Sequence, residues 1–212
     1  MALNKLQALK LIQLLNQSIK NPETSLKYRN QFTLLTSVVL SAQCTDTNVN
    51  NVTKDIYKKY YTPKHFTDLG ITKLKRMIKS IGLFNIKAKN LYNLSKILFE
   101  KYQSKVPNNF DDLINLPGVG RKTANVVLNA AFNKPTIAVD THVFRVGNRT
   151  GLTNGKNPNQ VEDQLLKVLP KKYLKKAHHL ILLHGRYTCK SRNPLCTKCV
   201  INKICLYKDK NV

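Results

Sequence analysis

Residues 116–140 constrain the fold more than any other part of the chain. They read LPGVGRKTANVVLNAAFNKPTIAVD. The glycines of LPGVG predict a tight turn, and the segment from Arg121 to about Phe132 predicts a helix with one apolar face. A turn that leads into a helix start presents backbone N–H groups at the positive end of the helix dipole. Because glycine lets an anion approach the backbone closely, this stretch predicts a phosphate-binding site.

Two residues with reactive side chains flank this helix. Lys122 lies in its first turn, and Asp140 follows eighteen residues later. The twelve-residue helix carries the chain away by about 18 Å, and residues 133–139 can span up to about 23 Å on the return. The two side chains can therefore meet, as an amine nucleophile with an acidic helper would require. From the residues alone, plainer roles are favoured: Lys122 as a phosphate contact, and Asp140 as the N-cap of a helix that begins at Thr141.

Four cysteines near the C-terminus have the spacing of metal ligands. Cys189, Cys196, Cys199 and Cys205 form the pattern C-x6-C-x2-C-x5-C. Zinc sites usually contain two short Cys pairs, and here only Cys196 and Cys199 form one, so the spacing suits an iron–sulfur cluster better without excluding zinc. The fifth cysteine, Cys44, is expected to be a buried thiol.

The charge of the chain favours a polyanionic partner. The sequence contains 36 Lys and Arg against 11 Asp and Glu, a formal net charge of +25. A ribosomal or membrane-surface protein could share this balance, and solvated surface lysines explain part of it, but nucleic acid is the simplest partner. No apolar run approaches the roughly 18 residues of a membrane span, and no secretory signal pattern is present. We therefore expect a cytoplasmic protein that does not bind a membrane.

Apolar residues recur with the period of a helix along the whole chain, and alternating strand patterns are absent. The sequence thus predicts an all-α fold. The histidines of AHHLILLHG (178, 179 and 184) are interpreted as core or interface residues. The expected helices are 3–20, 30–43, one capped by Thr45 or Asp46, Pro63 to Gly70, 72–80, 86–102, 109–115, 121–132, 157–169 and 171–187.

Several motifs resemble one known family. LPGVGRKTA at 116–124 and VDTHVFRV at 139–146 are similar to the helix-hairpin-helix and catalytic aspartate segments of the endonuclease III family of DNA glycosylases, and SAQ at 41–43, IGLF at 81–84 and HGRYTC at 184–189 extend the resemblance. It implies two helical domains with a DNA-binding cleft between them. Residues 24–133 would form a six-helix domain containing the hairpin (about 109–132), and residues 1–23 plus 134–212 an iron–sulfur cluster domain.

The same resemblance implies an activity. A bifunctional DNA glycosylase and AP lyase would excise oxidised pyrimidines from duplex DNA in base excision repair, and would cut 3′ to the abasic site by β-elimination. Lys122 would be the Schiff-base nucleophile and Asp140 the catalytic carboxylate. A nucleoid-associated monomer is expected, with damaged or abasic duplex DNA as its partner. The presence of Lys122 argues against a monofunctional glycosylase, and Lys122 with Asp140 argues against a non-catalytic binding module or redox sensor.

The resemblance also assigns a cofactor and DNA contacts. A 4Fe–4S cluster would be held by Cys189, Cys196, Cys199 and Cys205. Gln43 would fill the space left by an extruded base, and Leu83 would wedge between bases of the opposite strand. Further DNA contacts are expected from the hairpin and from the cysteine loop, at Leu116, Gly118, Val119, Gly120, Arg121, Lys190, Arg192 and Lys198.

Overall fold

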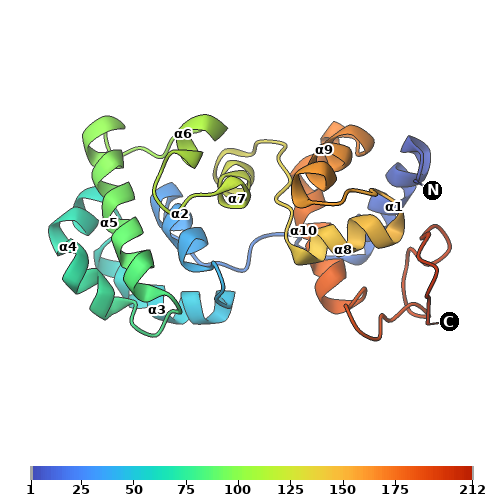
Figure 1. Ribbon diagram of the computed structural model, residues 1–212, viewed down its shortest axis with the longest axis horizontal. Helices are drawn as coiled ribbons and strands as arrows, with labels where there is room; N and C mark the ends of the chain where they lie inside the picture. Colours follow the sequence, from blue (N-terminus) through green and yellow to red (C-terminus); the bar gives the residue numbers. More distant parts are fainter. Residues whose placement is uncertain (1, 212) are drawn as a thin grey trace. The chain divides into compact units, whose positions relative to one another are not determined.

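The chain folds into helices joined by loops, as Figure 1 shows for the computed structural model, which describes residues 2–211. Within these residues there are ten helices and no strand, so the all-α prediction is confirmed. The helices are α1 (Lys5–Ser18), α2 (Gln31–Leu40), α3 (Asp46–Lys59), α4 (Pro63–Met77), α5 (Phe84–Lys101), α6 (Phe110–Ile114), α7 (Arg121–Phe132), α8 (Thr141–Thr150), α9 (Pro158–Val168) and α10 (Lys171–Tyr187).

Two compact units divide the chain, and each has its own hydrophobic core. The first, Ser25–Phe132, contains α2 to α7 and is called the central unit. The second combines Met1–Thr24 with Asn133–Val212, contains α1 and α8 to α10, and is called the terminal unit. The central unit is thus a continuous segment, whereas the terminal unit is built from both ends of the chain.

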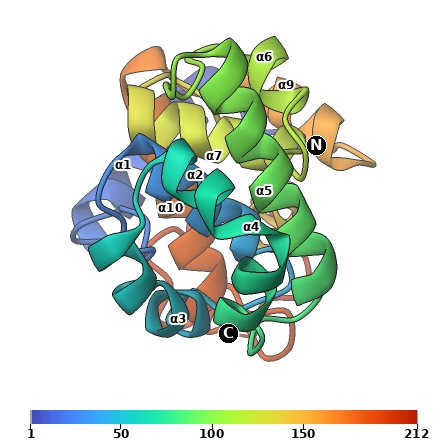
Figure 2. The ribbon, with the colours of Figure 1, turned by 90° about the vertical axis from the view of Figure 1, so that its left-hand side faces the viewer.

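Helix α2 forms the middle of the central unit. Every residue from Phe32 to Leu40 is buried, as expected for a helix that is apolar on nearly every side. The helix packs against α3, α5 and α7, while α4 and α5 lie side by side (Figure 2). At its start, the Asn30 side chain accepts a hydrogen bond from the Thr33 amide and Thr33 bonds back to Asn30, which fixes where α2 begins.

Gly70 interrupts the helical conformation, as the sequence suggested. It has φ 70° and ψ 165°, which are not helical values, and it lies at the kink between two helices that the label α4 covers together. The predicted boundary between the helices Pro63 to Gly70 and 72–80 is therefore confirmed, although the second helix ends earlier, at Met77. Glycine adopts this conformation readily, so a single residue is enough to change the direction of the chain between the two helices.

In the terminal unit, α10 packs against α8 and α1, and α9 packs against α8. The approach of α10 to α8 is close at Gly185, where a Cβ atom would lie 3.0 Å from the His142 Cβ. After α10 the chain continues as loops and turns through residue 211, and this segment contains all four clustered cysteines. No described helix combines the length and apolarity that a membrane crossing requires.

Candidate functional site

A short hairpin of helices, α6 and α7, presents the glycine turn predicted from LPGVG. Within the turn, the Leu116 amide donates to the Leu113 carbonyl at 3.1 Å, and the Val119 amide donates to the Leu116 carbonyl at 3.0 Å. Gly118 has φ +80°, and a Cβ atom there would lie 2.9 Å from Asn90 Nδ2 of α5. Both the backbone conformation and the close packing against Asn90 therefore require glycine at 118.

The hairpin residues predicted to contact DNA differ in exposure. Leu116 and Val119 are buried at 3% and 6% exposure, so their side chains belong to the core of the central unit. Any contact that these two residues make with a phosphate must come from their backbone. Gly118 and Gly120 are exposed, and the Arg121 guanidinium lies over the Phe110 ring at 5.4 Å. The turn thus offers an accessible backbone beside a cation.

Lys122 is exposed in the first turn of α7 and belongs to the central unit. Asp140, which belongs to the terminal unit, is the N-cap of α8. Its Oδ1 atom accepts a hydrogen bond from the Val143 amide at 2.8 Å, which confirms the capping role. The cap also fixes the orientation of the half-buried carboxylate, a condition that a catalytic carboxylate must meet.

The Gln43 and Leu83 turns meet in the central unit although forty residues separate them in sequence. Gln43 lies in the turn after α2 with φ 53°, and Leu83 precedes α5 with φ 61°. Both residues are exposed, Leu83 at 54%. A Cβ atom on Gly82 would lie 3.9 Å from the Gln43 carbonyl oxygen, so the turns are in contact range. The structure thus brings the predicted space-filling residue and the predicted wedge residue to one place.

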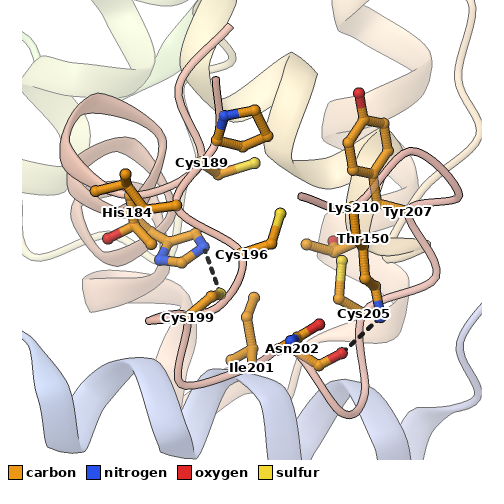
Figure 3. A pocket seen from close by; sticks show the side chains of 13 residues that line it. Thr150, His184, Cys189, Cys196, Cys199, Ile201, Asn202, Cys205, Tyr207 and Lys210 are labelled. Carbon is orange, nitrogen blue, oxygen red and sulfur yellow. Dashed lines mark hydrogen bonds between the residues drawn. The ribbon is translucent and has the colours of Figure 1, made fainter. Parts of the chain in front are cut away.

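All four cysteines of the C-terminal loop line a single cavity, together with His184 and Ile201 (Figure 3). Among the described residues, no group of three or more His, Cys, Asp or Glu side chains is arranged to hold a single metal ion. The four cysteines thus share the lining of one cavity. A tetrahedral zinc ion needs four ligands at about 2.3 Å from one centre, whereas a cubic cluster bonds each thiolate through a different iron.

Burial raises the pKa of the Cys199 and Cys205 thiols, and the neighbouring cysteines raise these pKa values further by charge repulsion. Four thiolates this close together need a cationic centre to compensate their charge. Burial also lowers the pKa of His184 to about 4, so this imidazole is neutral near pH 7. Its Nε2 atom lies 3.7 Å from Cys199 Sγ. His184 is buried, as expected, but it also lines the cysteine cavity, which the sequence did not indicate.

Two arginines of α8 hold the start of the cysteine loop. Arg145 donates to the Cys189 carbonyl at 3.1 Å and to the Gly185 carbonyl at 2.8 Å. Arg149 donates to the carbonyls of Lys190 at 2.6 Å and Ser191 at 2.9 Å. Helix α8 therefore has Asp140 at its N-terminus and, in its second half, the two arginines that hold the cysteine loop. Neither arginine was predicted as a site residue, although their spacing of four residues places them on one face of α8.

The three basic residues predicted to bind phosphates, Lys190, Arg192 and Lys198, are all exposed on this loop. Cys44 is only half-buried, unlike the buried thiol that was expected, and lies in the central unit apart from the other cysteines. By fold and turn geometry, then, the molecule is a helix-hairpin-helix protein with a separate cysteine cavity.

Comparison with known proteins identifies the family. Residues 36–171 match the HhH-GPD superfamily of base excision DNA repair proteins. Endonuclease III of Rickettsia conorii is 54% identical over 198 residues, which cover 93% of this chain and 94% of the relative. Endonuclease III of Escherichia coli is 48% identical over 208 residues, with 98% and 99% coverage. A solved structure of a trapped covalent intermediate of endonuclease III with DNA has a TM-score of 0.89 at 43% identity and covers 96% of both chains.

The chain therefore belongs to the HhH-GPD superfamily of base excision DNA repair proteins and, within it, to the endonuclease III family. The predicted family is confirmed, and so is the predicted enzyme class, a DNA glycosylase that also acts as an AP lyase.

Proposed function

We propose that this protein removes oxidised pyrimidines from duplex DNA and cuts the strand through a Schiff base on Lys122, with Asp140 as the catalytic carboxylate. The observation that carries the proposal is the position of Lys122, an exposed amine in the helix turn that directly follows the glycine turn. A phosphate held by this turn would bring the sugar of a nucleotide to the amine.

The reaction follows from ordinary amine chemistry. The neutral Lys122 Nζ donates its lone pair to C1′ of the deoxyribose, and the bond from C1′ to the base breaks with its electrons passing to the departing base, which is protonated. The nitrogen then loses a proton, and its lone pair forms the C1′=N bond of an iminium ion as the C1′–O4′ bond breaks, with the electrons of that bond passing to O4′, which takes up a proton. A proton then leaves C2′, and the C3′–O bond breaks with its electrons passing to the phosphate. Water hydrolyses the remaining Schiff base and releases the lysine.

Asp140 contributes a negative charge where positive charge develops on the sugar, and it can take up or return protons during these steps. Its cap to the Val143 amide keeps the carboxylate in one orientation. A stacked base cannot be attacked at C1′, so the target nucleotide must leave the duplex at a cost of a few kcal/mol. The adjacent turns with Gln43 and Leu83 are suited to occupy the vacated stack.

The cysteine cavity fits a 4Fe–4S cluster held by Cys189, Cys196, Cys199 and Cys205. The four cysteines line one cavity, and the charge repulsion among their thiolates calls for a cationic centre. When bound, such a cluster supplies a rigid covalent link across the loop and takes no part in the bond changes at the sugar. The loop then presents Lys190, Arg192 and Lys198 to phosphates from a fixed frame.

The same proposal assigns partners and domain roles. Duplex DNA with a damaged pyrimidine or an abasic site is the substrate, bound by a monomer associated with the nucleoid. The central unit supplies the hairpin, Lys122 and the stack-filling turns, and the terminal unit supplies Asp140 and the cluster. The DNA complexes of similar endonuclease III proteins support DNA as the partner.

Borohydride trapping tests the nucleophile. Wild type, Lys122→Ala and Lys122→Arg are incubated with a duplex that contains one thymine glycol, and covalent adducts are separated by electrophoresis. Arginine keeps the cation for a phosphate but stays protonated and cannot form the imine. We expect an adduct in the wild type and none in either variant, with DNA binding largely kept by Lys122→Arg.

An adduct that persists in Lys122→Arg would move the nucleophile to another residue. Base release without any adduct in the wild type would indicate a monofunctional glycosylase. DNA binding with neither base release nor adduct would favour the non-catalytic binding module. A duplex with an oxidised purine, assayed alongside, checks the substrate class, and equal release of both lesions would contradict the preference for pyrimidines.

A further inference from the structure

Lys87 is a buried lysine that the activity proposed above does not use. It lies one turn into α5, and only 4% of its surface is exposed. Burial lowers the pKa of its amine, because the charged form loses its hydration. None of the ion pairs found in residues 2–211 includes Lys87. A lysine enclosed without a carboxylate is rare in proteins and needs an explanation.

Two backbone carbonyls take the place of a carboxylate. The Lys87 Nζ atom donates to the Leu40 oxygen at 2.9 Å and to the Ala42 oxygen at 2.6 Å. Leu40 is the last residue of α2, where carbonyls have no partner within the helix and the dipole favours a cation. Ala42 directly precedes Gln43. The amine therefore fixes the backbone on the side from which the Gln43 turn leaves the helix.

The same helix also carries the Leu83 turn. The Lys87 amide donates to the Leu83 carbonyl at 3.0 Å, so the residue that holds the Gln43 turn is bonded directly to the second turn. Leucine at φ 61° is a strained conformation, which persists only where the surroundings enforce it. One turn further along α5, Asn90 packs against Gly118 of the hairpin. The first turns of α5 thus contact three segments that the proposed function assigns to DNA.

We propose that Lys87 is a positioning residue that locks the Gln43 turn to the Leu83 turn, so that both side chains enter the DNA stack at a fixed separation. This inference rests on the proposed function, because it requires the two turns to act on an extruded base. Without the hydrogen bonds from Lys87 Nζ to the two carbonyls, the Gln43 turn would be free to move relative to α5. The side chains of Gln43 and Leu83 would then no longer enter the duplex together. Extrusion of a paired base would then slow, while the chemistry at Lys122 would be unchanged.

The test compares two substrates that contain the same lesion but differ in the free energy needed to extrude it from the duplex. In the first, a thymine glycol is paired with adenine in a continuous duplex. In the second, the opposite strand has a one-nucleotide gap at the lesion, so there is no partner base to separate or hold. Base release is measured under single-turnover conditions with Lys87→Met, which keeps the length of the side chain and removes its donors. We expect release from the paired lesion to fall roughly 10- to 100-fold and release from the gapped substrate to change little.

Further variants keep the test decisive. Lys87→Arg retains donors and should preserve the ratio of the two rates, and Lys87→Gln replaces Lys87→Met should the latter not fold. Leu94→Ala leaves a cavity in the same helix without touching either turn, and it should slow both substrates equally if it slows them at all. Because Lys87 acts through Gln43, adding Lys87→Met to Gln43→Ala should cause little further loss on the paired lesion.

Equal losses on both substrates in Lys87→Met, or the same pattern in Leu94→Ala, would overturn the positioning role and leave Lys87 a purely structural residue. Fully multiplicative losses in the Gln43→Ala background would also overturn it. Wild-type protein that releases a base from neither substrate would overturn the proposed function, and the positioning role with it. The two failures are therefore distinguishable.

Discussion

Asp140 caps α8, and the proposed function also makes it the catalytic carboxylate; substitution can separate these two roles. As the N-cap of α8 it accepts a hydrogen bond from the Val143 amide, and asparagine can accept the same bond. We expect Asp140→Asn to retain the melting temperature, whereas Asp140→Ala should lose about 1 kcal/mol of unfolding free energy. Both variants should lose at least about 100-fold in base release, because neither has a carboxylate.

Chemical denaturation and single-turnover base release, measured on the same preparations, check this prediction. Activity in Asp140→Asn close to that of the wild type would show that the residue acts only as a cap. A loss of activity confined to Asp140→Ala would lead to the same conclusion.

Tyr57 provides a prediction for alkaline pH. Its hydroxyl lies 2.8 Å from both Thr36 Oγ1 and Ser37 Oγ, and burial raises its pKa to about 12. An unfolded tyrosine titrates near pH 10. Because the folded pKa is the higher one, the contribution to stability is complete below about pH 10 and is lost as the pH rises towards 12. Tyr57→Phe should lower the unfolding free energy by about 1 to 2 kcal/mol at pH 7, because the buried hydroxyls of Thr36 and Ser37 lose a hydrogen-bond partner.

The measurement is the unfolding free energy of the wild type and of Tyr57→Phe from pH 8 to pH 12. Lysines and the other tyrosines also titrate in this range, so the informative quantity is the difference between wild type and Tyr57→Phe. The difference should shrink above about pH 10, at a rate of up to about 1.4 kcal/mol per pH unit. A difference that stays constant across this range would contradict the raised pKa.

At the scale of elements, the hairpin contains two glycines with different constraints. Gly118 has φ +80° and faces Asn90, whereas nothing lies within 4 Å of a Cβ atom added at Gly120. Gly118→Ala should therefore lower the unfolding free energy by roughly 1 to 3 kcal/mol, and Gly120→Ala should have a much smaller effect. Thermal unfolding of the two variants checks this, and equal losses would contradict the geometry of the turn.

Local patterns were sufficient to predict most helices. The second hairpin helix was expected at 121–132 and the last helix at 171–187, and the structure has Arg121–Phe132 and Lys171–Tyr187. Capping residues and apolar periodicity act within a few positions, so the sequence displays them directly. Gly70 could be predicted as a helix boundary for the same reason, because glycine readily adopts a positive φ that interrupts a helix, and Gly70 has φ 70°.

The clustering of the four cysteines could likewise be expected from their spacing. The contacts of Lys87, Arg149 and His184 could not, because their partners are distant in sequence. Lys87 bonds to carbonyls more than forty residues away, and Arg149 to carbonyls of the cysteine loop. Every residue has a backbone carbonyl, so the sequence does not indicate which carbonyl a side chain will hydrogen-bond.

For the whole molecule, the two separate cores predict that loss of the proposed iron–sulfur cluster destabilises the terminal unit and not the central unit. The cysteine loop is attached to α8 and α10, whose core lies in the terminal unit. Cys196→Ser should therefore decrease amide protection in α8 and α10 and leave the core helices of the central unit protected. Hydrogen exchange followed by mass spectrometry measures both units in one experiment.

Cys44→Ser is the matched control, because Cys44 is the cysteine of the central unit. This variant should keep a straw-brown colour and about four iron atoms per chain, whereas Cys196→Ser should lose most of its iron. A colourless wild type with one zinc ion would overturn the cluster assignment. Protection lost equally in both units would contradict the independence of the two cores.

The net charge of +25 predicts that DNA binding weakens steeply with salt. Each Lys or Arg that neutralises a phosphate releases a counterion, which contributes about −0.9 to the slope of log K against log salt. A chain that contacts several phosphates should therefore lose at least roughly 1000-fold in affinity between about 50 and 200 mM salt. A flat response would contradict the DNA interface itself.

Substitution of paired and unpaired cations locates this effect on the molecule. Lys190 and Arg192 are exposed on the cysteine loop, and replacing both with glutamine should make the salt slope less steep by about 2. Lys58 and Lys64 are also exposed, but the Nζ atom of each lies 2.8 Å from a carboxylate oxygen of its own helix. Because their charge is already compensated, replacing them should change the slope by well under 1. Equal changes in the two double variants, measured by fluorescence anisotropy on the same duplex, would mean that the loop holds no phosphate and that the charge acts only as a diffuse field.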